Sequence, residues 1–95
     1  AKAKGLGIYD FIPKNPTIYE NPPFIGFSLL DEKLVPSIDC FVFDSKGEVE
    51  KEIFKFNERI EIRLSRKLTE GRSRMNCTAK GSDNHWRWFG HQFYL

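Results

Sequence analysis

Apolar and polar residues alternate along most of this chain with a period of two, which predicts strands rather than helices. The two clearest runs are residues 59–65 and 72–80, where apolar side chains share one face and charged or polar side chains share the other. The apolar positions of these runs are Ile60, Ile62, Leu64, Met75, Cys77 and Ala79. We expect both runs to form half-buried strands, joined by a short connection at residues 66–71.

Further strands are predicted between prolines and turn signals. The aromatic-rich residues 85–95 are predicted to form a hairpin with the run before them, and Gly90 is expected to mark a bulge or bend. A single helical turn is expected within residues 30–35. The other predicted strands are residues 24–30, 37–43 and 48–56, with a loop or short edge strand at residues 17–19. About seven short strands predict an all-β fold, an immunoglobulin-like antiparallel β-sandwich.

The chain has 95 residues, enough for one domain. Residues 1–15 are interpreted as a leader or linker, and residues 16–95 as the immunoglobulin-like sandwich. The first residue is Ala1 rather than Met, so we expect a processed chain or part of a longer one. No apolar run approaches the roughly 20 residues of a membrane-spanning helix, so no membrane span is expected.

The two cysteines lie in the middle of two predicted strands. Cys40 shares its face with Ile38 and Val42, and Cys77 lies on the apolar face of residues 72–80. If these strands belong to opposite sheets, a Cys40–Cys77 disulfide would bridge the core, as in many sandwiches. The alternative is a pair of free buried thiols. A disulfide implies an oxidising compartment, so we expect a periplasmic, cell-surface or secreted protein.

The formal net charge is only +2, which does not support non-specific nucleic-acid binding. The charge is uneven: residues 1–58 carry seven Lys and ten Asp or Glu, whereas residues 59–95 carry eight Lys or Arg and three Asp or Glu. One interpretation is that arginines occupy strand faces that point to water. The other is a surface for an anionic partner, such as an acidic glycan, nucleic acid or another protein domain.

The closing strand carries the candidate ligand-binding residues. Trp86 and Trp88 lie two positions apart and share a face, so they would form a stacking platform for sugar rings if that face is exposed. Arg87 and Gln92, together with His91, lie on or near this strand as polar neighbours. The competing interpretation places at least one tryptophan in the core, where large aromatic residues usually lie.

No catalytic arrangement is visible, so the chain itself is not expected to be an enzyme. The carboxylates are scattered, and His85 and His91 have no Ser or Cys partner whose position suggests a triad. Gly5-Leu6-Gly7 lacks the rest of a phosphate-binding loop. Two lone cysteines without a His pair at ligand spacing do not suggest zinc, and no cofactor is predicted.

The order of these signals resembles bacterial immunoglobulin-like domains, including the CopC-type periplasmic copper-binding sandwich. The resemblance covers residues 16–95 and rests on pattern: the Pro-flanked first strand, the turn at residues 44–47, the alternating strands and the aromatic closing strand. It implies Cu(II) ligands at an N-terminal His and at an Asp-x-His after the penultimate strand. Asp83-Asn84-His85 matches the second element, whereas position 1 is Ala1. Asp83 and His85 are therefore weak metal candidates.

Residues 74–79 and 86–90 are also similar to the small sandwich appended to some bacterial polysaccharide deacetylases. This resemblance implies a non-catalytic accessory module, whose partner would be a polysaccharide or an adjoining catalytic domain. A carbohydrate-associated module of an exported protein that processes cell-envelope polysaccharide is the main interpretation. The alternatives are a CopC-like periplasmic copper-binding protein and a structural interaction domain.

Overall fold

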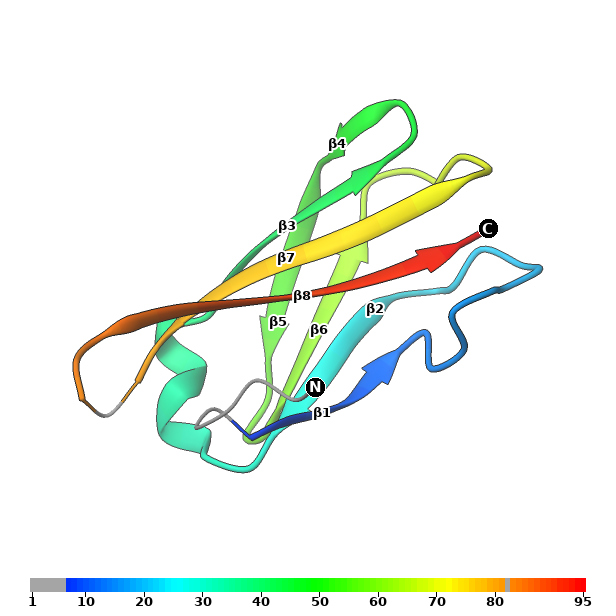
Figure 1. Ribbon diagram of the computed structural model, residues 1–95. Coiled ribbons are helices and arrows are strands. Elements are labelled where there is room, and N and C mark those ends of the chain that lie inside the picture. The colour runs from blue at the N-terminus through cyan, green and yellow to red at the C-terminus, as the bar shows by residue number, and fades with distance from the viewer. Residues whose placement is uncertain (1–6, 82) are drawn as a thin grey trace.

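The computed structural model describes residues 7–81 and 83–95, which form two antiparallel sheets that pack against each other (Figure 1). One sheet has the strand order β1-β2-β6-β5 and the other has the order β4-β3-β7-β8. Their bounds are β1 Ile8–Ile12, β2 Ile25–Leu29, β3 Asp39–Asp44, β4 Gly47–Val49, β5 Lys51–Lys55, β6 Arg59–Leu64, β7 Arg72–Lys80 and β8 Trp86–Tyr94. The predicted all-β sandwich is confirmed, with eight strands in the described residues rather than about seven.

The core lies between the two sheets and is built from the inward-facing residues of both. The apolar positions that alternation predicts in β6 and β7 are buried there, apart from the half-buried Leu64. Phe27 of β2 and Phe93 of β8 are the largest side chains that are fully buried. Burial of a side chain of this size contributes about 1.5–3 kcal/mol to the free energy of unfolding, so these two residues are large contributors to the stability of the sandwich.

Strands β2 and β6 approach each other unusually closely at Gly26. Gly26 pairs with Glu61, and a Cβ atom added to Gly26 would overlap the carbonyl oxygen of Ile60. Because glycine has no side chain, the backbones of the two central strands of this sheet can approach each other closely at this point.

The segment expected to be a leader contributes a strand. Strand β1 pairs with β2 at the edge of its sheet, so the sandwich includes residues before the boundary predicted at residue 16. The register shifts between Tyr9 and Ile12, where Asp10 has a positive φ of 52°. This irregularity breaks the alternation on which the sequence prediction depended. Residues 1–6 of the expected leader lie outside the described residues.

Residues 48–56, predicted as one strand, are divided between the two sheets. Strand β4 lies at the edge of one sheet and β5 at the edge of the other, and the chain crosses between them at Glu50. The helical turn expected at residues 30–35 is a 3-10 helix, η1 (Glu32–Ser37), which begins slightly later. Asp31 caps it by accepting a hydrogen bond of 3.0 Å from the backbone N–H of Lys33.

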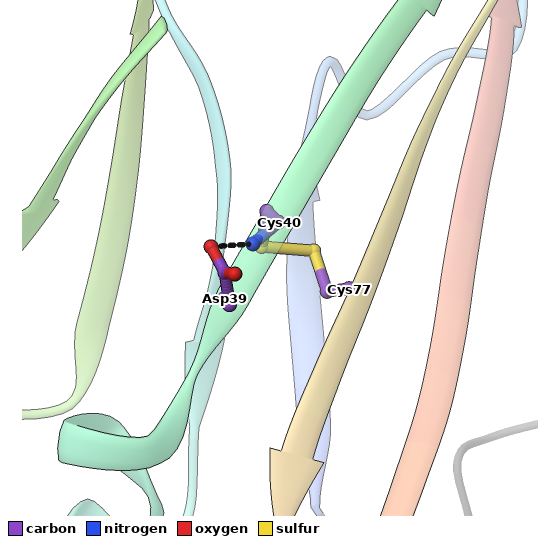
Figure 2. Close-up of a disulfide and its surroundings, with 3 residues drawn as sticks. All are labelled: Asp39, Cys40 and Cys77. Atoms are coloured by element: carbon purple, nitrogen blue, oxygen red, sulfur yellow. Dashed lines mark hydrogen bonds between the residues drawn. A yellow bond between two sulfur atoms is a disulfide. The ribbon is translucent and has the colours of Figure 1, made fainter.

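Cys40 and Cys77 form the predicted disulfide, but the bond lies within one sheet (Figure 2). Strands β3 and β7 are neighbours, and Cys40 stands directly opposite Cys77 in their register. The two strands do not belong to opposite sheets, so the condition under which the bond would bridge the core is not met. Both residues do face the core, as predicted. They can still bond to each other, because inward-facing residues that stand opposite each other on adjacent strands lie close together.

Candidate functional site

The outer face of the sheet β4-β3-β7-β8 gathers exposed aromatic, basic and amide side chains. Alternate residues of these strands point away from the core, and the register places them opposite one another. We call this surface the aromatic–basic face. Its members are Asp39, Phe41, Phe43, Arg72, Arg74, Asn76, Thr78, Lys80, Trp86, Trp88, Gly90, Gln92 and Tyr94. The face combines stacking surfaces with hydrogen-bonding groups.

Both tryptophans of the closing strand point to solvent on this face. Trp86 is 60% exposed and Trp88 is 75% exposed, and Tyr94 continues the row at 45%. The core positions of β8 are Phe89 and Phe93, which lie in the opposite phase of the strand. The interpretation that placed one of the tryptophans in the core is therefore wrong.

Gly90 opens a groove of about 340 Å³ in the middle of the aromatic–basic face. Strand β8 passes Gly90 in continuous register with β7, so of the bulge or bend expected at Gly90 the bulge is absent. A Cβ atom at Gly90 would lie 3.1 Å from Oδ1 of Asn76 and 4.0 Å from the Trp88 ring. Because glycine has no Cβ atom, the backbone of Gly90 forms the bottom of the groove, and the Trp88 ring, the Asn76 amide and Gln92 line its sides.

A second hollow, of about 530 Å³, adjoins the groove at Arg74. Phe43, Lys46, Arg72 and Arg74 contribute to its lining. The guanidinium of Arg74 lies 5.0 Å from the centre of the Phe43 ring, a cation–π contact that holds the charge against the sheet. The face therefore has an aromatic part around Trp88 and a basic part around Arg74.

Arg87, one of the residues singled out in the sequence, does not lie on this face. It stands between the two tryptophans in the chain, so it points to the other side of the sheet. Its guanidinium binds both carboxylate oxygens of Asp83, with Nη1 at 2.8 Å from Oδ1. Gln92 does lie on the face, opposite Arg74.

His91 is also turned away from the aromatic–basic face. Its Nε2 lies 2.9 Å from the carbonyl oxygen of Pro13, and its ring stacks on Phe11 with the centroids 4.6 Å apart. This histidine ties the N-terminal segment to β8, which is a structural role. Sequence reasoning missed Arg74 and Asn76 among the groove residues, because their place on the same groove as Trp88 depends on the register of β7 with β8.

Asp83 and His85, the weak metal candidates, lie together in the turn between β7 and β8. Nδ1 of His85 is 3.7 Å from Oδ2 of Asp83, and the backbone N–H of His85 donates to Oδ1 at 3.1 Å. The bonds from Arg87 and from this N–H hold the pKa of the Asp83 carboxyl well below its usual range. Both oxygens of Asp83 are thus already bound to a cation.

This turn fits a copper ion poorly as it stands. Among the described residues, no three His, Cys, Asp or Glu side chains gather as metal ligands. A metal ion at Asp83 would have to displace the guanidinium of Arg87, and His85 would supply one further ligand. Ala1, at the position of the N-terminal His of the CopC-type family, lies outside the described residues.

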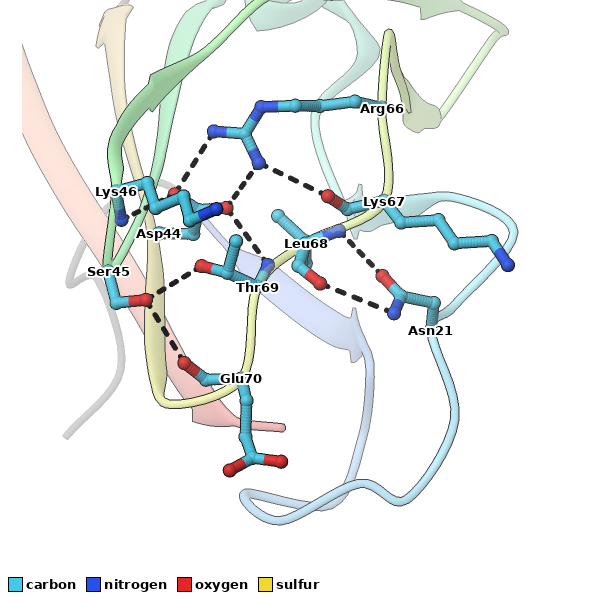
Figure 3. A network of polar contacts seen from close by, with 9 residues as sticks. All are labelled: Asn21, Asp44, Ser45, Lys46, Arg66, Lys67, Leu68, Thr69 and Glu70. Carbon is cyan, nitrogen blue, oxygen red and sulfur yellow. Dashed lines mark hydrogen bonds and ion pairs between the residues drawn. The ribbon is translucent and has the colours of Figure 1, made fainter.

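Asp44 is the other carboxylate with a strongly perturbed environment (Figure 3). Its buried oxygens accept bonds from Arg66 at 2.5 and 3.1 Å, from the Thr69 N–H at 3.0 Å and from the Lys46 N–H at 2.9 Å. These donors, Arg66 foremost, hold the pKa of Asp44 far below its usual range. A perturbed pKa often marks a functional site, but here the protein itself occupies both oxygens, so we assign Asp44 a structural role.

A larger hollow, of about 710 Å³, lies elsewhere, between η1 and the turn that joins β5 to β6. Lys33, Lys55 and Phe56 are among its lining residues, and Lys55 already donates to the carbonyl oxygen of Pro36 at 3.1 Å. It offers one aromatic ring rather than a row, so the aromatic–basic face is the stronger candidate.

Comparisons with known proteins match this chain by structure alone. No protein-family model matches the sequence, and no curated protein matches it. The chain is similar to CopC from Methylosinus trichosporium OB3b, with a TM-score of 0.73 and 15% identity over 94% of this chain and 91% of that one. It is also similar to PcoC, a methionine-rich copper resistance protein from Escherichia coli, with a TM-score of 0.75 and 15% identity over 94% and 96% of the two chains.

These likenesses establish the fold class. The chain is an all-β sandwich with the CopC-like, immunoglobulin-like fold that the first resemblance implies. At 15% identity they carry no information about the ligand, and the comparisons provide no link to a polysaccharide deacetylase. The ligand must be argued from the surface of this chain.

Proposed function

We propose that this chain is a non-catalytic domain of an exported protein and that it binds a polysaccharide on the aromatic–basic face. One observation carries the proposal: Trp86 and Trp88 stand side by side on the outer face of β8, both largely exposed. Exposing two indole rings to water on an isolated surface has no folding benefit. A sugar chain would cover them by stacking.

The polar neighbours of the tryptophans suit a glycan. Thr78 stands opposite Trp88, and Asn76 and Gln92 border the groove at Gly90. These side chains supply donors and acceptors for sugar hydroxyl groups. Trp86 and Tyr94 are eight residues apart on β8, which corresponds to roughly 26 Å of strand, so the face matches an extended chain better than a compact ligand.

The disulfide supports an extracytoplasmic location. Disulfides persist in oxidising compartments and are rare where thiols are kept reduced. The Cys40–Cys77 bond, together with the CopC-like fold, favours the periplasm for this chain. In that compartment the polysaccharide would belong to the cell envelope, as the resemblance to deacetylase accessory domains predicts.

Tryptophan fluorescence during titration with a panel of cell-envelope and neutral glycans tests the proposal. We expect saturable binding by at least one glycan, and Trp88→Ala should weaken it about tenfold because the stacking surface is lost. Phe56→Ala is the matched control, since Phe56 is a half-exposed aromatic residue that lies at the β5–β6 turn. If no glycan binds, the proposal is wrong, and packing of this face against a catalytic domain is the remaining explanation.

Copper binding is the second candidate, and the Asp83–His85 pair in a CopC-like fold favours it. Cu(II) would have to compete with Arg87 for Asp83. Titration with Cu(II) should then give a stoichiometric visible spectrum that His85→Ala abolishes and Arg87→Gln strengthens. A featureless titration of the wild-type chain would eliminate this candidate without affecting the first.

A further inference from the structure

We propose that the polysaccharide is acidic, and that its carboxylate or phosphate groups bind between Arg72, Arg74 and Lys46 while another sugar ring of the same chain stacks on Trp88. This inference rests on the proposed function, because it names the class of glycan that the aromatic–basic face takes. The observation that carries it is the junction of the two hollows at Arg74.

The two hollows share one lining residue, and we call them together the path. Arg74 lines both of them, and it stands opposite Gln92 of β8 and Phe43 of β3 in the register. Trp88 and Gln92 are four residues apart, which places the indole roughly 13 Å along the strand from the level of Arg74. One glycan segment can therefore contact the aromatic part and the basic part together.

The basic part is positively charged and its cations are free to bind a ligand. Among the described residues, no ion pair is formed by Arg72, Arg74 or Lys46. Asp44 also borders this hollow, but its side chain is fully buried and its charge is neutralised by Arg66. The local charge therefore lacks an internal counterion.

Two exposed carboxylates lie at the margins of the face rather than within the path. Glu48 stands on the edge strand β4, opposite Phe43. Asp39 is the first residue of β3, and its carboxylate accepts a hydrogen bond of 2.9 Å from the backbone N–H of Cys40. Neither residue lines the two hollows, so the path itself favours anions.

The chemistry of arginine selects the ligand class. A guanidinium presents its N–H donors in a plane that matches two oxygens of a carboxylate or phosphate. The guanidinium of Arg74 lies 5.0 Å from the centre of the Phe43 ring and forms no ion pair among the described residues, so its N–H donors are available for such a bidentate bond. Neutral hydroxyl groups could not use the charge of three unpaired cations in this way.

The test compares one glycan with and without its carboxylates, and adds a phosphorylated glycan. We would titrate the chain with three glycans: a galacturonate hexasaccharide, the same hexasaccharide after reduction of its carboxylates to alcohols, and a phosphomannan fragment. Binding would be followed by tryptophan fluorescence and by the heat released in calorimetry. Arg74→Gln is the test variant. Arg63→Gln is the matched control, because Arg63 lies 4.7 Å from the Phe54 ring in a similar contact on the other sheet.

We expect an acidic glycan to bind at least about tenfold more tightly than the reduced one at low salt, and the preference to shrink as salt rises. Arg74→Gln should remove the preference, Arg63→Gln should keep it, and Trp88→Ala should weaken both glycans alike. The carboxylate and phosphate arms identify which anion is preferred. Equal binding of charged and reduced glycans would overturn this inference and leave the proposed function intact, whereas no binding of any glycan would overturn both.

Discussion

Asp44→Asn would remove the one buried charge of the network that ties the β3–β4 hairpin to the segment after β6. Its carboxylate accepts four hydrogen bonds, two of them from Arg66, and its side chain is fully buried whereas that of Arg66 is 39% exposed. Breaking a buried pair costs about 3–5 kcal/mol. Because Arg66 can turn to water once its partner is neutral, we expect the lower end, about 3 kcal/mol less free energy of unfolding.

The effect should depend on pH in a defined direction. The pKa of Asp44 is lowered in the folded protein, so its contribution to stability is present above the unfolded pKa of about 4 and is lost as pH falls toward the folded value. The free energy of unfolding of wild type and of Asp44→Asn would be measured by urea unfolding, followed by tryptophan fluorescence, at pH 7 and at steps down to pH 2. The difference between wild type and Asp44→Asn should shrink steadily below about pH 5.

Asp83→Asn is the matched control for this experiment. Asp83 also holds an arginine through both oxygens, but the pair with Arg87 is solvent-exposed. Exposed ion pairs contribute little, so this variant should unfold close to wild type. Equal effects of the two substitutions, or a difference for Asp44→Asn that does not change with pH, would refute the reasoning from burial.

Three further variants test other parts of the structure. Replacing Cys40 and Cys77 together with alanine should lower stability by about 4 kcal/mol, measured by chemical unfolding, since the disulfide joins residues 37 positions apart. Gly26→Ala should cost several times more than a typical exposed substitution, because its Cβ would meet the Ile60 carbonyl, and a melting temperature equal to wild type would contradict this close approach. Trp88→Ala should leave the melting temperature nearly unchanged, because the side chain is 75% exposed.

Alternation in the sequence predicts the strands well but says little about how they are partnered. Residues 59–65 and 72–80 behave as expected, because their inward-facing side chains have one core to fill. The period of two cannot reveal that the chain changes sheets at Glu50, since the alternation of neighbouring residues does not record which strand lies beside them. For the same reason, the inward orientation of Cys40 and Cys77 was predictable, whereas their placement in one sheet was not.

The aromatic–basic face shows which further information a site on a sheet requires. Alternation shows that Trp86 and Trp88 share a face, and the opposite phase of Phe89 and Phe93 decides that this face is the outer one. Arg87 lies on the other side of the sheet from the two tryptophans, because adjacent residues of a strand point to opposite sides. The correct partners come from the neighbouring strand, and their identity follows once one pair of the hairpin is known. Since Lys80 pairs with Trp86 and the register has no bulge, each step back along β7 moves one step forward along β8, which brings Arg74 opposite Gln92. The turn between the strands therefore decides which cation stands beside which ring.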